Sequence, residues 1–134
     1  MADTVSRVIL QDGRKRAVVR AQLDSDGTGS TDAILVDRSA LSGGPDGSEP
    51  GRLVIERIEY DCEGMTVALE FDHDTDDHIA SLSSAGVFDF SQDGKYQGYI
   101  DPNTSGGTGD IVGTTTGHTA GDKATFVFYL RKKD

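Results

Sequence analysis

The sequence predicts an all-β fold: an antiparallel β-sandwich or jelly roll of about eight or nine short strands, in a single domain spanning residues 1–134. Two observations lead to this fold class. Apolar and polar residues alternate with a period of two over several short segments, which is typical of strands with one buried face. Gly- and Asp-rich turns separate these segments, and no window offers ten residues of helical periodicity.

The first elements read as a hairpin followed by a short strand. Residues 5–10 and 15–23 alternate as strands, and the Asp-Gly dipeptide at 12–13 between them is a strong hairpin signal. A turn-rich segment follows, and residues 33–36 form the next short strand. Residues 38–51 hold most of the Pro and many Gly residues, so we expect a surface loop or arm there.

The middle and end of the chain continue the same pattern. Residues 52–61 and 65–71 alternate clearly, and Cys-Glu-Gly at 62–64 between them predicts a turn, so we interpret the segment as a second hairpin. Further short strands are expected at 79–82, 87–90, 96–100, 111–116 and 124–131.

Length, composition and charge exclude several classes of protein. A chain of 134 residues fits one domain. The formal net charge of −10 repels phosphate, so we expect no nucleic-acid partner. Apolar runs are too short to span a bilayer, and the first residues lack the features of a secretory signal, so no membrane partner is expected. The single cysteine, Cys62, excludes an intrachain disulfide and is predicted to pack as a small apolar side chain.

One acidic segment resembles a calcium-binding loop. Asp24, Asp26, Thr28 and Asp32 fall at the first, third, fifth and ninth positions of such a loop, and their oxygens suit calcium. The twelfth position is Leu35, however, where a bidentate Glu is needed, and Asp and Gly are also the residues of ordinary tight turns. We therefore expect a plain turn, with no metal and no cofactor, and keep Asp24, Asp26 and Asp32 as the candidate ligands.

No pattern in the chain predicts catalysis. The acidic segment 72–78, DHDTDDH, matches no known ligand spacing and is interpreted as a solvated loop. Serine is absent from any nucleophile-elbow motif, and the Gly-rich segments lack the following helix that a phosphate cradle needs. We expect a protein that is not an enzyme.

Two basic clusters break the acidic balance. They either protect strand edges from stray pairing or form a docking surface for an acidic partner. The acidic residues gather at 24–32 and 72–77, which predicts a polarised molecule that docks by its basic end and turns its acidic loops away. The candidate partner-binding residues are Arg14, Lys15, Arg16, Arg131, Lys132 and Lys133.

The segment 108–133, TGDIVGTTTGHTAGDKATFVFYLRKK, resembles the closing segment of a family of small structural proteins of tailed bacteriophages and prophages. The similarity extends in outline to ADTV at the start, SDGTG at 25–29, VDRSALS at 36–42, IERIEYDCEGM at 55–65 and FDF at 88–90. The acidic 72–78 loop and the Gly- and Pro-rich 42–51 loop depart from that pattern.

The resemblance implies a capsid decoration (cement) protein. Such a protein would be made in the bacterial cytoplasm, lie on the capsid surface of the virion and stabilise the lattice of the major capsid protein, associating with copies of itself as a trimer. Residues 2–7, the 38–51 loop and the basic ends are the expected contacts. A neck or tail component is an alternative, because function does not follow from fold. A calcium- or carbohydrate-binding β-sandwich module is the other alternative, although the chain has no Trp.

Overall fold

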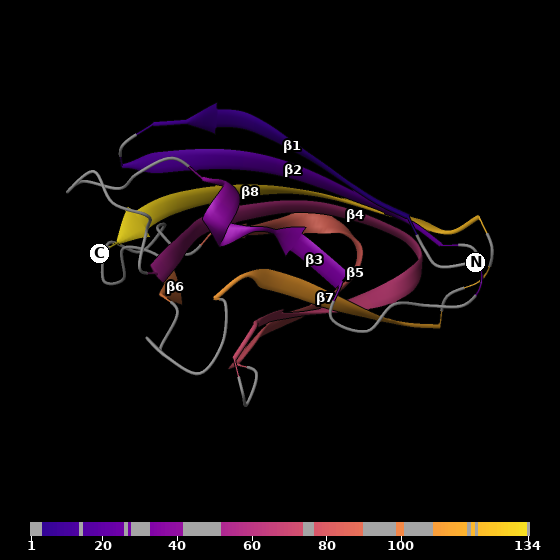
Figure 1. Cartoon of the computed structure of the whole chain (residues 1–134). Helices are drawn as coiled ribbons and strands as arrows, with labels where there is room; N and C mark the ends of the chain where they lie inside the picture. The colour runs from indigo at the N-terminus through magenta and orange to yellow at the C-terminus, as the bar shows by residue number, and fades with distance from the viewer. Residues whose placement is uncertain are drawn as a thin grey trace.

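The chain folds almost entirely into strands. The computed structural model describes residues 4–13, 15–25, 27, 33–41, 52–73, 77–89, 99–100, 109–117, 119 and 121–133. These residues form eight strands and one short 3-10 helix, arranged in two layers (Figure 1). The elements are β1 (Thr4–Asp12), β2 (Arg16–Asp24), β3 (Ala33–Val36), η1 (Arg38–Ala40), β4 (Arg52–Phe71), β5 (Asp77–Asp89), β6 (Tyr99–Ile100), β7 (Ile111–Thr116) and β8 (Lys123–Lys133). All strand pairs are antiparallel, so the predicted fold class is confirmed.

The long strand β4 connects the two layers. Its residues 52–63 pair with β8, which continues through β2 to β1 and forms the larger layer. Its residues 66–71 pair with β7, which continues to β3 and forms the smaller layer. On its other side β4 pairs with β5 in both layers, and with β6 beyond the end of β5. One continuous sheet therefore folds over on itself.

The hairpin predicted at 52–61 and 65–71 is wrong, because these residues form one bent strand. Gly64 lies in the bend with a φ of 81°, a conformation that glycine adopts without strain. In the partner strand, Ser84 has a φ of 61°. Between the pairs Cys62–Ser84 and Val67–Leu82, β4 uses four residues where β5 uses one, so a bulge turns the pair through the corner. Likewise, the two strands predicted at 79–82 and 87–90 join in β5.

The hydrophobic core lies between the two layers. In β2 and β8 every second side chain points inward, as the alternation predicts. Each large side chain buried in this way contributes roughly 1.5–3 kcal/mol to folding. The largest fully buried side chains are Phe71, Phe126, Phe128, Leu23, Leu35, Leu53, Ile55, Ile58, Leu69, Leu82, Ile111 and Leu130. Among the described residues, no helix is long and apolar enough to cross a membrane.

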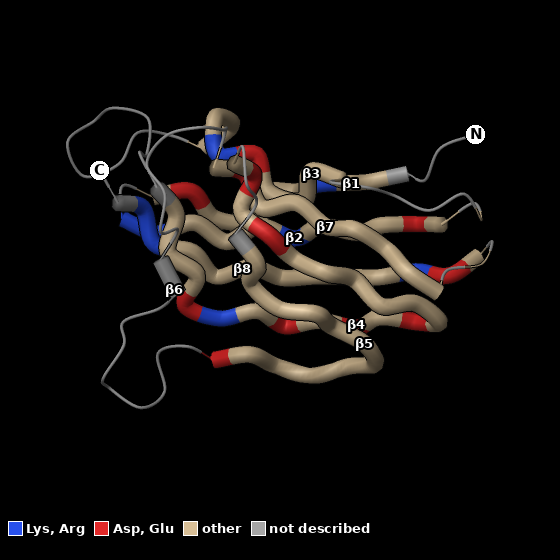
Figure 2. Tube along the Cα trace, turned by 90° about the horizontal axis from the view of Figure 1, so that it is seen from below, with Lys and Arg blue, Asp and Glu red and all other residues tan. Residues whose placement is uncertain are grey.

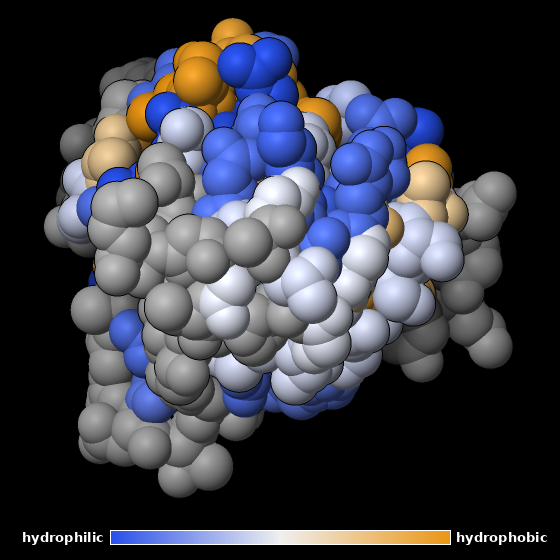
Figure 3. All heavy atoms as spheres, turned by 90° about the vertical axis from the view of Figure 1, so that its right-hand side faces the viewer, coloured by the Kyte–Doolittle hydropathy of each residue, from blue (hydrophilic) through white to orange (hydrophobic). Residues whose placement is uncertain are grey.

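The larger layer has an edge strand on each side, β1 and the second half of β5. Figure 2 shows β1 and β5 along opposite sides of the molecule. On the β1 side the two layers approach each other, and the Arg7 guanidinium donates to the Ile34 carbonyl of β3 at 2.9 Å. Farther along β1, a bulge between Ile9 and Gln11 interrupts the pairing with β2. Figure 3 shows apolar side chains gathered at the top of the molecule, over β1.

Candidate functional site: the basic end of the larger layer

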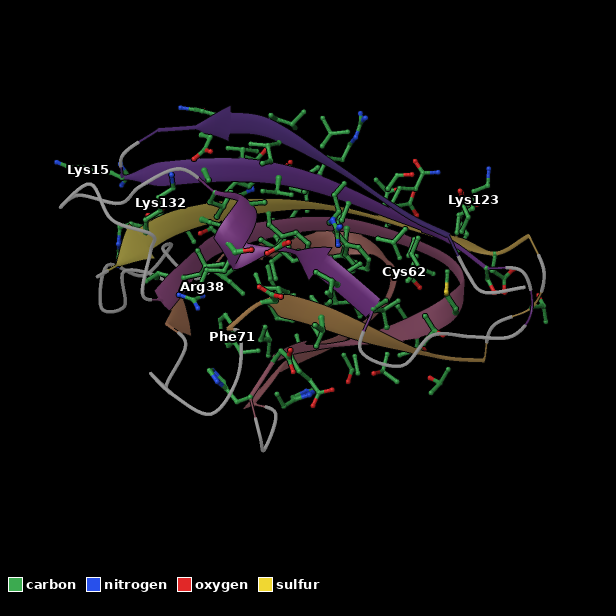
Figure 4. All side chains as sticks on the ribbon, in the orientation of Figure 1. Lys15, Arg38, Cys62, Phe71, Lys123 and Lys132 are labelled. Carbon is green, nitrogen blue, oxygen red and sulfur yellow. The ribbon has the colours of Figure 1, made fainter. Side chains whose placement is uncertain are left out.

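The antiparallel pairing of β2 and β8 brings the two basic clusters together. Arg16 lies opposite Arg131, and the backbone N–H of Lys132 donates to the carbonyl of Lys15 at 2.7 Å. We call these four residues the basic end; Figure 4 shows Lys15 and Lys132 side by side at the end of the molecule where β8 ends. Arg14 lies outside the described residues. Lys133 ends β8, and only its backbone is described.

A carboxylate of β4 lies between the two arginines. The Arg16 Nε is 2.9 Å from Oε1 of Glu56, and the Arg131 guanidinium is 3.5 Å from Oε2 of the same side chain. The hydrogen bond and charge of Glu56 raise the pKa of Arg16. Glu56 therefore neutralises part of the basic end and links three neighbouring strands.

Lys132 has a structural position rather than a surface one. Its side chain is fully buried, and its ammonium group donates to the Asp12 carboxylate and to the Gly13 carbonyl. This contact fixes the tip of the β1–β2 hairpin to the end of β8. A buried ammonium needs such partners, because its desolvation is otherwise very unfavourable. Lys132 therefore adds no charge to the exposed surface.

The exposed cations of this end are then easily identified. Lys15 is exposed, and 61% of the Arg16 side chain is accessible despite its ion pair with Glu56. Arg131 is partly buried, with 29% of its side chain accessible. Such groups, held on a rigid strand pair, can bind the carboxylates of another protein.

The predicted separation of charge holds for Asp24, where the first acidic segment begins, and fails for Asp72, where the second begins. Asp24 lies opposite Lys123, at the far end of the β2–β8 pair from the basic end. Phe71, however, lies at the same end of the molecule as Lys132, as Figure 4 shows, and the acidic segment 72–77 begins directly after it. The bend in β4 explains this result, because it returns the chain to the end from which it started.

The structure assembles no metal site in the part of the chain that it describes. Asp24 accepts a hydrogen bond from the Gln22 amide at 3.1 Å, and no group of three His, Cys, Asp or Glu side chains among the described residues could hold a metal ion. Asp26 and Asp32 lie outside the described residues, so the calcium-loop hypothesis stays a prediction.

Cys62 lies at the corner where β4 bends. It lines an open depression of about 260 Å³ together with main-chain and hydroxyl groups of the corner, among them Thr66, Ser83, Ser84 and Thr116. Burial raises the pKa of the Cys62 thiol to about 11, and the nearby Asp61 adds to this effect. The thiol is therefore neutral at physiological pH and a poor nucleophile.

Sequence reasoning missed the partners of the basic residues. The sequence predicts only a turn at Asp12 and a strand at Glu56, and no local pattern indicates that either residue contacts the basic end. Sequence reasoning also missed a group of exposed apolar residues in the first strand, although the sequence contains a signal for it. Val8, Ile9 and Leu10 are consecutive and break the alternation of that strand. All three are exposed.

Sequence reasoning also missed Asp110, whose carboxylate is buried. It is 5% exposed, and its Oδ1 accepts from the backbone N–H of Arg38 at 2.8 Å, which anchors η1 beside the start of β7. The adjacent Asp37 caps this helix by accepting from the backbone N–H and hydroxyl of Ser39, and these bonds lower the pKa of Asp37. Both carboxylates serve the local fold.

Comparison with known proteins does not assign a family or a function to the chain. No model of a protein family and no curated protein matches the chain. The function therefore has to be inferred from the residues and their arrangement, and the resemblance of the sequence to phage structural proteins stays a prediction.

Proposed function

We propose that this chain is a non-enzymatic structural protein of a bacteriophage virion, and specifically a capsid decoration protein. It binds the major capsid protein on the outside of the capsid, associates with copies of itself and stabilises the lattice. The observation that carries the proposal is the meeting of the two basic clusters on one rigid strand pair, β2 and β8, which presents Lys15 and Arg16 to a partner.

The segments that resemble phage proteins support this proposal through their place in the fold. The segment 108–133 contains β7 and β8, which pair with the two halves of β4, and the segment 55–65 contains the bend of β4. The residues of these two segments thus build the centre of the sheet. That pattern fits proteins that have a scaffold in common rather than a catalytic pocket.

The surface of the described residues favours a protein partner over a small ligand. Three depressions formed by these residues are small, with volumes of about 160, 230 and 260 Å³. Small-molecule sites are usually concave and enclose roughly 300–1,000 Å³. Exposed apolar side chains instead line strand edges, and the exposed cations Lys15 and Arg16 are neighbours at one end. Both features suit contacts with other protein chains.

Copy number in the virion gives the first test. We expect quantitative mass spectrometry of particles from the phage or prophage that encodes this chain to find it in numbers comparable with the major capsid protein. A number that fits only one ring of subunits would instead indicate a neck or tail component and overturn the decoration hypothesis. Complete absence from the particles would overturn the virion proposal itself.

A pair of charge reversals tests the docking surface. Lys15→Glu and Lys123→Glu change the net charge equally, but Lys15 lies at the basic end and Lys123 at the opposite end of the β2–β8 pair (Figure 4). We expect Lys15→Glu to weaken binding to capsids that lack this protein by about tenfold, whereas Lys123→Glu binds as the wild type does. Equal weakening by both variants would show a response to net charge alone and would contradict docking through the basic end.

A further inference from the structure

Both edge strands of the larger layer expose clusters of apolar side chains. On β1, Val8 and Ile9 are each 41% exposed and Leu10 is 53% exposed. On β5, Val87 is 51% exposed and Phe88 is 37% exposed. We call the first group the β1 edge and the second group the β5 edge. Single exposed apolar residues are ordinary, but runs of them on an edge strand favour association.

The main chain at these two places is also open to pairing. Among the described strands, β1 pairs only with β2, and the part of β5 that carries Val87 pairs only with β4. An edge strand presents unpaired N–H and C=O groups that can add a strand from another chain. The bond from Arg7 to β3 occupies the first half of β1, so the β1 edge begins just beyond it.

The charges beside the two edges are opposite. Arg7 and Arg20 are exposed beside the β1 edge, and Arg20 lies directly opposite Val8 in the β1–β2 pair. Glu59, Asp61 and Asp89 lie beside the β5 edge, together with one cation, Arg57, directly opposite Asp89 in the β4–β5 pair. Glu59 accepts from the Arg57 guanidinium at 3.0 Å and from the Tyr129 hydroxyl at 2.7 Å, so the carboxylates outnumber the cation at this edge. The β1 edge is thus apolar and basic, whereas the β5 edge is apolar and acidic.

We infer that the partner of each edge is a second copy of this chain: the β5 edge of one copy docks against the β1 edge of the next. The larger layer then continues from copy to copy. Pairing of two β1 edges would bring Arg7 and Arg20 close to their own counterparts, which is unfavourable, whereas the β1–β5 contact places arginines near aspartates. Because the two edges lie on opposite sides of the molecule (Figure 2), the contact is head-to-tail and produces a ring or an open chain of copies.

This inference describes how two copies contact each other. It rests on the proposed function in one respect only, namely that a decoration protein associates with copies of itself. Its test uses purified protein alone. Failure here therefore leaves binding to the capsid lattice to be judged by its own experiment, and failure of capsid binding leaves this contact standing.

Two blocked variants and their mixture test the head-to-tail contact. Leu10→Lys places a charge in the β1 edge, and Val87→Lys places one in the β5 edge; both positions are about half exposed, so the fold should remain intact, which a thermal melt checks. By analytical ultracentrifugation we expect the wild type to associate with increasing concentration and each variant to stay monomeric. An equimolar mixture should form a one-to-one heterodimer and nothing larger, because each variant keeps one intact edge. Ser81→Lys, at an exposed position in the other half of β5, should associate as the wild type does.

Other outcomes overturn the inference. A wild-type protein that remains monomeric at the highest concentration it tolerates has no such contact. Association that survives Val87→Lys but not Leu10→Lys would indicate pairing of two β1 edges. A mixture of the two variants that stays monomeric would exclude a contact between the β1 edge and the β5 edge.

Discussion

The two ends of the sandwich are held by different interactions. At the basic end, side-chain charges connect the strands: Glu56 lies between Arg16 and Arg131, and Lys132 reaches Asp12 from the last strand. We call the opposite end, where β4 and β5 bend, the corner end. There the backbone of two neighbouring strands adopts positive φ angles. Gly64 has a φ of 81°, and Ser84 in the neighbouring strand has a φ of 61°.

The difference shows that charge at a surface does not by itself indicate a binding site. At the basic end, much of the positive charge is used within the fold, and Lys132 is fully buried. The proposed docking at that end would therefore use Lys15 and the exposed part of Arg16. At the corner end, the acidic Asp122 accepts from the backbone N–H and hydroxyl of Thr119 and lies against Gly64, so it supports a turn.

The largest expected loss of stability comes from removing the buried ammonium group at the basic end. Lys132→Met keeps most of the side-chain volume but removes the ammonium group, which leaves the Asp12 carboxylate and the Gly13 carbonyl without this donor. Losing one partner of a buried pair usually lowers the free energy of unfolding by about 3–5 kcal/mol. Because the Asp12 side chain is 22% exposed and can be partly rehydrated, we expect a loss of about 3 kcal/mol in a urea titration.

The matched control lies on the same strand. Lys123→Met removes an exposed ammonium group at the other end of β8, and its effect on unfolding should stay within about 0.5 kcal/mol. If both variants lose the same stability, the buried pair is no more important than an exposed lysine, and the contrast between the ends fails.

The parts of the fold that follow from local alternation were predictable. The Asp-Gly turn predicts the first hairpin, and the period of two predicts the buried faces of β2 and β8. The bend of β4 was not predictable in this way, because a hairpin and a bent strand share the same alternation. Pairing with β5 and β7, both distant in sequence, decides between them.

The sequence predicts which basic residues form the candidate site, but not how they are arranged. The sequence shows two basic clusters, but the register between β2 and β8 brings them together, and the buried position of Lys132 follows from that register. Its partner Asp12 is 120 residues away in the chain. No local pattern indicates a contact over such a separation, so the division between structural and exposed cations required the structure.

The next effect probes the corner end. A Cβ at Gly64 would lie 2.5 Å from an Asp122 carboxylate oxygen, and the φ of 81° is unfavourable for any residue with a Cβ. Gly64→Ala should therefore lower the free energy of unfolding by about 2 kcal/mol, as measured by denaturant titration. Gly121→Ala separates the two causes, because Gly121 has a φ of 93° but no atom within 4 Å of its Cβ position. It should lose about 1 kcal/mol.

Gly13→Ala completes this series. The nearest atom to its Cβ position is the Arg16 carbonyl oxygen at 3.5 Å, an ordinary contact, and its φ lies outside the left-handed region. We expect a change close to zero. Equal losses for Gly64→Ala and Gly121→Ala would show that the close approach of Asp122 adds nothing, and the corner end would then depend on backbone conformation alone.

The smallest effect is a pH dependence at the corner end. Burial raises the pKa of Cys62 from its ordinary value of 9.0 to about 11. Because the folded state favours the neutral thiol, this stabilisation is complete below the ordinary pKa and is lost as the pH rises through about 11. The wild type should therefore lose between about 1 and 2 kcal/mol more stability than Cys62→Ala from about pH 8 to about pH 11.

Comparing the two proteins isolates the thiol. Hydrogen bonding to Glu59 raises the pKa of Tyr129, and that hydroxyl also titrates in alkaline solution, but it is present in both proteins and cancels in the difference. The cavity left by Cys62→Ala shifts its stability by an amount that does not depend on pH. Parallel stability curves for the two proteins would show that the thiol of Cys62 is as accessible in the folded state as in the unfolded one. The corner would then be open to solvent rather than closed around Cys62.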